Sequence, residues 1–149
     1  MLSIPLVLFP GAAHHISNNA DALLFLSLIS GRNPDFLIGQ HVEAIDELEQ
    51  MNIETIPTSY LLIDGGKMSS VQYVSGTQPI PQDEFSIARK TALAGKHLGQ
   101  KLIYADAGSG AIRPISCEMI ETLSTVKSPL IVGGGLNSIK RVKAAHNSG

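Results

Sequence analysis

Short apolar runs alternate along the chain with segments whose apolar residues recur at helical spacing. The runs cover residues 4–9, 22–29, 53–63, 102–105 and 130–132, and they are rich in aliphatic and aromatic side chains. Strands with so few polar positions are buried on both faces, which is typical of a parallel sheet. The pattern therefore predicts five strands of one parallel sheet.

Four segments between or after these strands have the pattern of amphipathic helices. Residues 33–51 begin with an N-cap asparagine followed by a proline at the first helical position. Residues 84–98, residues 116–126 and a last segment that begins at Asn137 or Ser138 repeat the helical spacing. The helix over 84–98 is rich in alanine and glycine, so we expect it to pack closely on the sheet.

Three features depart from this alternation. Residues 10–21 connect the first two strands without helical periodicity, and a full helix hardly fits into so short a crossover. Residues 64–83 form a long loop rich in glycine and proline, with residues 71–74 as a possible short strand. Pro57 interrupts the third strand, because a regular central strand does not tolerate proline, and this break suggests that residues 58–60 turn toward a site.

The order of the elements selects the α/β class with a parallel sheet. An open doubly wound sheet and a part of a (β/α)8 barrel both fit, and in both folds ligands bind at the C-terminal ends of the strands. Glycine turns follow two consecutive strands, which favours the barrel, since its phosphate site is typically built from neighbouring βα loops. We expect residues 1–149 to form a single domain.

Composition narrows the class of protein. The 149 residues are 44% apolar and 16% charged, which is typical of an ordinary globular domain. The formal net charge of −2 gives no electrostatic footprint for nucleic acid. Cys117 is the single cysteine and cannot form an intramolecular disulfide, and no apolar segment reaches the roughly 20 residues that span a bilayer. We therefore expect a soluble, cytoplasmic protein that holds any anionic ligand through local groups.

Two glycine turns are the strongest candidates for such groups. Gly108, Ser109 and Gly110 follow the fourth strand, and a run of three glycines from Gly133 to Gly135 follows the fifth. Glycine lacks the Cβ that would keep a phosphate away from backbone N–H groups. Each turn alone could be no more than a tight strand–helix connection, but two on successive strands favour a phosphate site.

Asp106 lies between the fourth strand and its glycine turn, so its carboxylate is expected to point into the same cleft. A carboxylate beside a phosphate is unfavourable unless it binds hydroxyl groups or a metal, which suggests a phosphorylated polyol as the ligand. The alternative is a purely local role as an Asx turn or helix cap. Tyr104 and Tyr60 could supply hydroxyls or ring walls to the cleft, or could be core residues.

Other catalytic motifs are absent from the sequence. The five histidines show no zinc-type spacing with other ligands, and we interpret them as structural or exposed. The sequence contains no Gly-x-Ser-x-Gly elbow, no P-loop and no Cys-x-x-Cys pair. Acyl transfer by the elbow motif and nucleotide hydrolysis by a P-loop therefore have no support.

Taken together, these motifs resemble the geranylgeranylglyceryl phosphate synthases and their bacterial heptaprenylglyceryl phosphate synthase relatives. The resemblance extends over nearly the whole chain. The matching motifs are Leu8-Phe9-Pro10-Gly11, Phe25-Leu26-Ser27-Leu28, Ser30-Gly31-Arg32-Asn33-Pro34, Ile56-Pro57-Thr58-x-Tyr60, Pro79-Ile80-Pro81, Tyr104-x-Asp106-Ala107-Gly108-Ser109-Gly110 and Ile131-Val132-Gly133-Gly134-Gly135. The resemblance implies a (β/α)8 TIM barrel without a regular third helix, which fits the short connection over residues 10–21.

The implied activity is a prenyltransferase of ether-lipid synthesis, which joins sn-glycerol 1-phosphate to a prenyl diphosphate, releases pyrophosphate and uses Mg²⁺. In this family's pattern the acid is often glutamate, and here it is Asp106, which would hold or deprotonate the attacking hydroxyl as the catalytic residue. Tyr60 would lie near the prenyl group. The implied substrate-binding residues are Tyr104, Ala105, Asp106, Ala107, Gly108, Ser109, Gly110, Gly134, Gly135 and Tyr60.

The resemblance also marks what the chain does not contain. The family's first two strands, which carry its metal-binding acids, would precede residue 1, and its final strand would follow residue 149. We therefore expect no metal ligands in this chain, which corresponds to the central part of a TIM-barrel prenyltransferase, and we expect the full-length protein to be a homo-oligomer. The alternative is a non-catalytic, truncated barrel fragment that at most binds phosphate.

Overall fold

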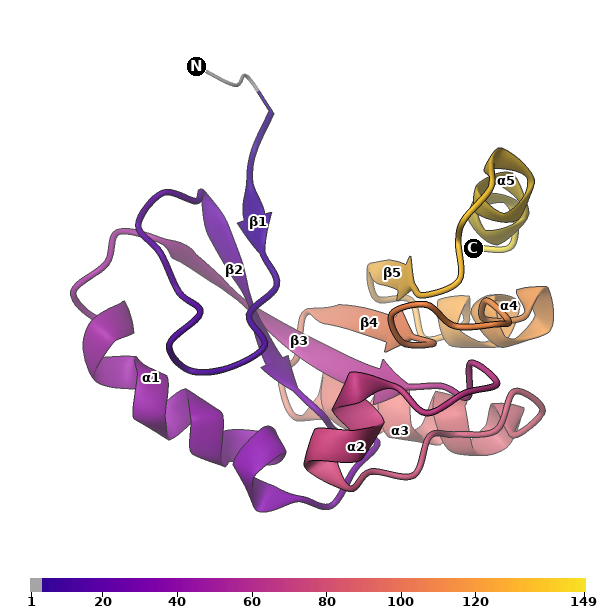
Figure 1. The fold of residues 1–149 in the computed structure, drawn as a ribbon, viewed down its shortest axis with the longest axis horizontal. Coiled ribbons are helices and arrows are strands. Elements are labelled where there is room, and N and C mark those ends of the chain that lie inside the picture. The colour runs from indigo at the N-terminus through magenta and orange to yellow at the C-terminus, as the bar shows by residue number, and fades with distance from the viewer. Residues whose placement is uncertain (1–3) are drawn as a thin grey trace.

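The computed structural model describes residues 4–149. Its centre is a parallel sheet of strands β1 (Val7–Leu8), β2 (Ala22–Ser27), β3 (Glu54–Leu62), β4 (Leu102–Asp106) and β5 (Leu130–Gly133). The helices are η1 (Asp35–Gly39, a short π-helix), α1 (Gln40–Leu48), α2 (Ser70–Ser75), α3 (Phe85–His97), α4 (Cys117–Ser124) and α5 (Ile139–Asn147). The sheet curls, with α1, α3 and α4 along its outer side (Figure 1). Within residues 4–149 no helix has the length and apolar composition needed to cross a membrane.

The strands lie in space in the same order as along the chain. Each strand pairs in parallel with the next, so the sheet order is β1-β2-β3-β4-β5. A doubly wound sheet reverses its strand order at a switch point, whereas a (β/α)8 barrel does not. The α/β class and the partial barrel are confirmed, and the doubly wound alternative is wrong.

The connection between β1 and β2 contains no helix in residues 9–21, as the sequence predicts for residues 10–21. The two strands that it joins are tied together at their N-terminal ends, because the backbone N–H of Leu6 donates to the Asp21 carboxylate over 2.7 Å and the backbone N–H of Asp21 donates to the Leu6 carbonyl over 2.9 Å. The loop leaves the C-terminal end of β1, passes close to α1 and returns to the N-terminal end of the parallel strand β2 (Figure 1).

The register of the strands decides which side chains face the barrel interior. Paired residues of parallel strands lie on the same face, and successive residues alternate between faces. Leu61, Ile103 and Ala105 belong to the largest apolar cluster, together with α3 and α4 on the outer face. The inner face of β3, β4 and β5 carries Tyr60, Leu62, Tyr104, Asp106, Ile131 and Gly133.

Close packing of α3 on the sheet depends on its small residues. Ala88 and Ala92 are completely buried in the outer-face cluster. A Cβ atom at Gly95 would overlap the hydroxyl of Ser59 on β3 and would also contact Ile29. The expectation that the alanines and glycine of this helix permit a close approach to the sheet is confirmed.

The predicted break at Pro57 is wrong, because β3 continues through it from Glu54 to Leu62. The backbone N–H of Lys101 donates to the Pro57 carbonyl, so the polar side of Pro57 faces β4. Pairing with β4 begins only at Thr58 and Leu102. The missing N–H of Pro57 therefore has no ladder partner to lose, and the strand tolerates the proline.

The possible strand over residues 71–74 is also wrong, because these residues belong to α2. The side chain of Ser69 accepts a hydrogen bond from the backbone N–H of Gln72 as the N-cap, and Gly76 ends the helix in the left-handed region with φ of 65°. A serine at the N-cap favours the start of a helix, and a glycine after the last turn favours its end. These caps outweigh the strand preference of the valines and tyrosine between them.

Candidate functional site

Asp106 is the last residue of β4 and is 9% exposed on the inner face of the sheet. Its Oδ1 accepts a 2.8 Å hydrogen bond from the backbone N–H of Gly108, and its Oδ2 accepts a 2.6 Å hydrogen bond from the hydroxyl of Tyr60. The first bond is the Asx turn that the sequence suggests as an alternative, and the second adds a link to β3. A carboxylate can accept about four hydrogen bonds, so Asp106 retains capacity for a ligand hydroxyl.

Three aromatic rings pack together beside Asp106. The ring centroids of Tyr60 and Tyr104 are 5.7 Å apart, and Phe9 lies 5.8 Å from the first and 4.8 Å from the second. Burial, and then the charge of Asp106, raises the pKa of Tyr60 and that of Tyr104. Both phenols therefore stay protonated at neutral pH and can donate hydrogen bonds to anionic oxygens.

The two predicted glycine turns are locked against each other. Gly108 and Gly134 have φ of 88° and 82°, in the region where residues with a Cβ are strained. A Cβ at Gly134 would lie 2.8 Å from the backbone N and O of Gly108, and one at Gly133 would lie 2.5 Å from the Tyr104 hydroxyl. These glycines therefore allow two βα loops to pack backbone to backbone.

Not every predicted donor in these turns is available to a phosphate. The N–H of Gly108 is used by Asp106, and the N–H of Ala107 donates to the Gly133 carbonyl. Four other backbone N–H groups of the turns donate no hydrogen bond within residues 4–149. They belong to Ser109, Gly110, Gly134 and Gly135. These four groups are the free donors of the site.

Ala105 and Ala107, which the sequence analysis assigned to the substrate-binding site, lie on the outer face of the sheet. Their side chains are 0% and 2% exposed and belong to the outer-face cluster. They support the site from behind and present no side chain to a ligand on the inner face. The structure brings Tyr60, Tyr104 and Asp106 together, with both glycine turns beside them.

A third loop, which the sequence analysis did not assign to the site, closes against the turn after β4. The backbone N–H groups of Ile112 and Arg113 donate to the Gly65 carbonyl over 2.9 Å and 3.0 Å. Lys67 Nζ lies 3.1 Å from the position that a Cβ on Gly110 would occupy, so one ammonium group stands at the edge of the turn. The signal was Gly65-Gly66, a third glycine turn directly after a strand.

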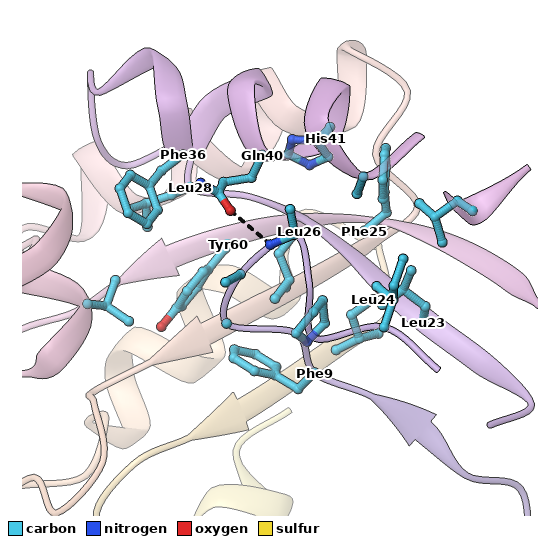
Figure 2. A pocket seen from close by; sticks show the side chains of 18 of the residues that line it. Phe9, Leu23, Leu24, Phe25, Leu26, Leu28, Phe36, Gln40, His41 and Tyr60 are labelled. Carbon is cyan, nitrogen blue, oxygen red and sulfur yellow. Dashed lines mark hydrogen bonds between the residues drawn. The ribbon is translucent and has the colours of Figure 1, made fainter. Parts of the chain in front are cut away.

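An apolar cavity of about 120 Å³ adjoins the polar site (Figure 2). Its walls come from β2, from the inner side of η1 and α1, and from the loop over residues 10–16. Leu24, Leu26 and Phe36 are typical of its lining. Tyr60 joins the two regions, because its ring lines the cavity while its hydroxyl donates to Asp106.

The residues of this chain do not form a metal site of their own. Within residues 4–149 no three His, Cys, Asp or Glu side chains gather closely enough to hold a metal ion. Asp106 is the one carboxylate among the inner-face residues at the C-terminal ends of β3, β4 and β5. The other inner-face residues at these strand ends are aromatic, aliphatic or glycine, and such residues offer no carboxylate or amide oxygen to Mg²⁺.

Comparison with known proteins gives a consistent result. A sequence model described as the PcrB family matches residues 1–147. Geranylgeranylglyceryl phosphate synthase from Spirosoma linguale is 51% identical over 148 residues, and the enzyme of that name from Thermococcus kodakarensis is 41% identical over the same length. These matches cover 99% of this chain and 59% and 58% of the two relatives. The chain thus spans about three-fifths of the length of the curated relatives it matches.

Solved structures agree with the sequence relatives. Wild-type GGGPS from Thermoplasma volcanium superposes with a TM-score of 0.92 at 36% identity, covering 99% of this chain and 59% of that one. (S)-3-O-geranylgeranylglyceryl phosphate synthase from Thermoplasma acidophilum, solved in complex with the substrate sn-glycerol-1-phosphate, has the same TM-score at 33% identity, covering 99% and 60%. The resemblance found in the sequence motifs is confirmed.

Proposed function

The chain belongs to the PcrB family, and from this premise we propose that the protein containing it is a prenyltransferase that joins sn-glycerol 1-phosphate to a prenyl diphosphate. The names of its relatives and the ligand of the Thermoplasma acidophilum enzyme support both the reaction and the acceptor. The chain covers only 59% of its relatives' length, so the proposal concerns the whole protein.

The observation that carries the proposal is the double role of Tyr60. Its ring is part of the wall of the apolar cavity, and its hydroxyl is bonded to Asp106 at the polar site. A transferase that joins a hydrocarbon chain to a phosphorylated polyol needs an apolar site and an anion-binding site that meet at the reacting atoms. Tyr60 stands at that meeting point.

The phosphate of the acceptor is proposed to bind the free backbone donors at the ends of β4 and β5. The N–H groups of Ser109, Gly110, Gly134 and Gly135 have no other partner within residues 4–149. Backbone N–H groups in glycine turns bind phosphate oxygens without side-chain rearrangement. Lys67 adds one positive charge beside Gly110, which reduces the repulsion between the phosphate and the Asp106 carboxylate.

Asp106 is proposed to hold the glycerol hydroxyl that attacks the prenyl diphosphate. A new C–O bond forms between that hydroxyl oxygen and the allylic carbon, the bond from this carbon to the diphosphate oxygen breaks, and the diphosphate leaves with the electron pair. The hydroxyl proton passes to Asp106. The hydrogen bonds from Gly108 and Tyr60 keep the carboxylate oriented during this step.

Mg²⁺ stays a prediction of the family resemblance. The inner-face residues of this chain do not fit a magnesium site, so no step of the reaction is assigned to the metal. A cytoplasmic location, a homo-oligomeric assembly and a role in ether-lipid synthesis likewise stay predictions.

Product analysis tests the proposed activity. Protein expressed at its natural length is incubated with sn-glycerol 1-phosphate and prenyl diphosphates from geranyl to heptaprenyl, and prenylglyceryl phosphate and pyrophosphate are quantified. We expect the two products in equal amounts, and much less product with sn-glycerol 3-phosphate as the control acceptor. Binding of glycerol phosphate without product from any prenyl donor would favour the alternative, a non-catalytic phosphate-binding protein.

A further inference from the structure

Gln40 is a polar exception on the cavity face of its helix. The side chains that this face turns to the cavity repeat at helical spacing, and apart from Gln40 and its neighbour His41 they are apolar, namely Phe36, Ala44 and Leu48. A polar group on an otherwise apolar face costs free energy unless it is hydrogen-bonded. The hydrogen-bond partner of the Gln40 side chain therefore indicates why this position is a glutamine.

That partner is the loop on the opposite side of the cavity. Gln40 Oε1 accepts a 2.9 Å hydrogen bond from the backbone N–H of Ala13, which crosses from α1 to the loop (Figure 2). Within residues 4–149 this is the sole hydrogen bond that joins residues 10–18 to another element, since the bonds of His15 to Ala12 and of Asn19 to Ser17 stay inside the loop.

The loop also makes apolar contacts through a few side chains. Ala13 and Ile16 are half-buried against the cluster of Leu23, Ala44 and Leu48. No helix replaces the missing backbone hydrogen bonds of residues 10–18. The position of the loop over the cavity thus depends on one side-chain acceptor and two modest side chains.

We infer that Gln40 is a positioning residue that fastens residues 10–18 as the roof of the apolar cavity and so preorganises the binding site of the prenyl chain. The inference rests on the proposed function for the identity of the occupant. A roof that is already in place lowers the ordering cost of binding a flexible hydrocarbon chain. Gln40 thereby influences prenyl binding without contacting the reacting atoms.

Two measurements on protein of natural length test this role. Hydrogen exchange of the Ala13 amide reports the fastening directly, and the KM for geranylgeranyl diphosphate reports its effect on binding. In Gln40→Met, which keeps the length of the side chain but removes the acceptor, we expect about threefold to tenfold faster exchange at Ala13, the scale of one net hydrogen bond. The KM for the prenyl diphosphate should rise by a similar factor, with kcat and the KM for glycerol phosphate changed less than about twofold.

Two variants serve as controls. Gln40→Glu keeps an acceptor oxygen in either protonation state, so Ala13 exchange should stay at the wild-type rate. Gln50→Met makes the same chemical change at an exposed glutamine just beyond α1 and should change neither readout.

Each outcome decides between the claims. Unchanged Ala13 exchange in Gln40→Met would overturn the fastening, and faster exchange with an unchanged or lower KM for the prenyl diphosphate would overturn its role in binding. If the wild-type protein turned over no prenyl diphosphate, the proposed function would fail, whereas Ala13 exchange would still decide whether Gln40 holds the loop.

Discussion

At the C-terminal ends of β3, β4 and β5 the chain packs backbone against backbone, whereas beside β2 a loop of irregular structure covers the apolar cavity through one hydrogen bond. Gly65 accepts two backbone hydrogen bonds from the next loop, and Gly134 touches the backbone of Gly108. On the other side the bond from Ala13 to Gln40 is the one hydrogen bond within residues 4–149 that joins residues 10–18 to another element.

This difference matches the demands of the two proposed substrates. A small phosphorylated polyol has few internal rotations, so it gains most from donors fixed in one geometry. A prenyl chain is long, flexible and held by non-directional contacts, and an adjustable cover suits it better. The polar region is therefore expected to respond sharply to substitution, and the apolar region gradually.

Asp106→Asn should give the largest effect in the polar region. The amide cannot accept a proton at neutral pH, so kcat of the natural-length enzyme should fall roughly 10²-fold or more. The amide oxygen can still accept the bond from Gly108 and the amide NH2 can donate to the Tyr60 oxygen, so the thermal midpoint should change little. Asp83→Asn, at an exposed position, is the control. If Asp106→Asn kept the wild-type turnover, the role of Asp106 would be limited to forming the turn with Gly108.

Gly134→Ala tests whether backbone packing fixes the polar region. Gly134 and Gly76 both have positive φ, but only Gly134 has backbone atoms within 3 Å of a new Cβ, whereas Gly76 has nothing within 4 Å. Gly76→Ala should cost about 1 to 2 kcal/mol in the free energy of unfolding. Gly134→Ala should cost at least about twice as much and should raise the KM for glycerol phosphate. Equal costs in urea unfolding would show that the loops are not locked together.

Tyr60→Phe separates the two regions at the residue they share. The variant keeps the ring in the cavity wall and removes the hydroxyl that donates to Asp106. We expect kcat to fall about tenfold, the scale of one hydrogen bond to a charged group, while the KM for the prenyl diphosphate changes less than about twofold. Tyr73→Phe, at a tyrosine that is 77% exposed, controls for the loss of a phenol. A selective rise in the prenyl KM would instead place the hydroxyl on the prenyl side.

The smallest effect is expected from His41, in the apolar region. Burial lowers the pKa of His41 below its usual 6.5, although the nearby backbone groups of Ile38 and Leu26 oppose the change. Below pH 6.5 the unfolded chain binds a proton that the folded chain refuses, so stability should fall as the pH drops from 6.5 toward the lower, folded-state value. Thermal midpoints across this range should fall less steeply in His41→Gln than in the wild type. His97→Gln, at an exposed histidine, is the control for the loss of a histidine.

Much of the fold could be predicted from the sequence because its signals are local. Within residues 4–149, runs of apolar residues, helix caps and glycine turns placed all five strands and every helix except α2, with η1 and α1 inside one predicted segment. Pro57 was misinterpreted, because its cost depends on where β4 begins, and sequence spacing does not show that register. Residues 71–74 were misinterpreted because the caps at Ser69 and Gly76 outweigh strand preference.

The candidate site was predictable only in part, for the same reason. Asp106 and the glycine turns stand out in the chain because strand, acid and turn are adjacent. The bond from Tyr60 to Asp106 spans 46 residues and the bond from Ala13 to Gln40 spans 27, so neither leaves a local signal. Lys67 approaches Gly110 across a similar distance in sequence. These contacts exist only once the strands have paired.

The sequential order of the strands also bears on how the chain folds during synthesis. Because each strand pairs with the one made just before it, no strand has to wait for a distant C-terminal partner. Domains form from the N-terminus as the ribosome releases the chain at about 5 to 20 residues per second. Each emerging strand and helix can therefore add to the edge already formed, so that among β1 to β5 each new strand finds its partner as soon as it is made.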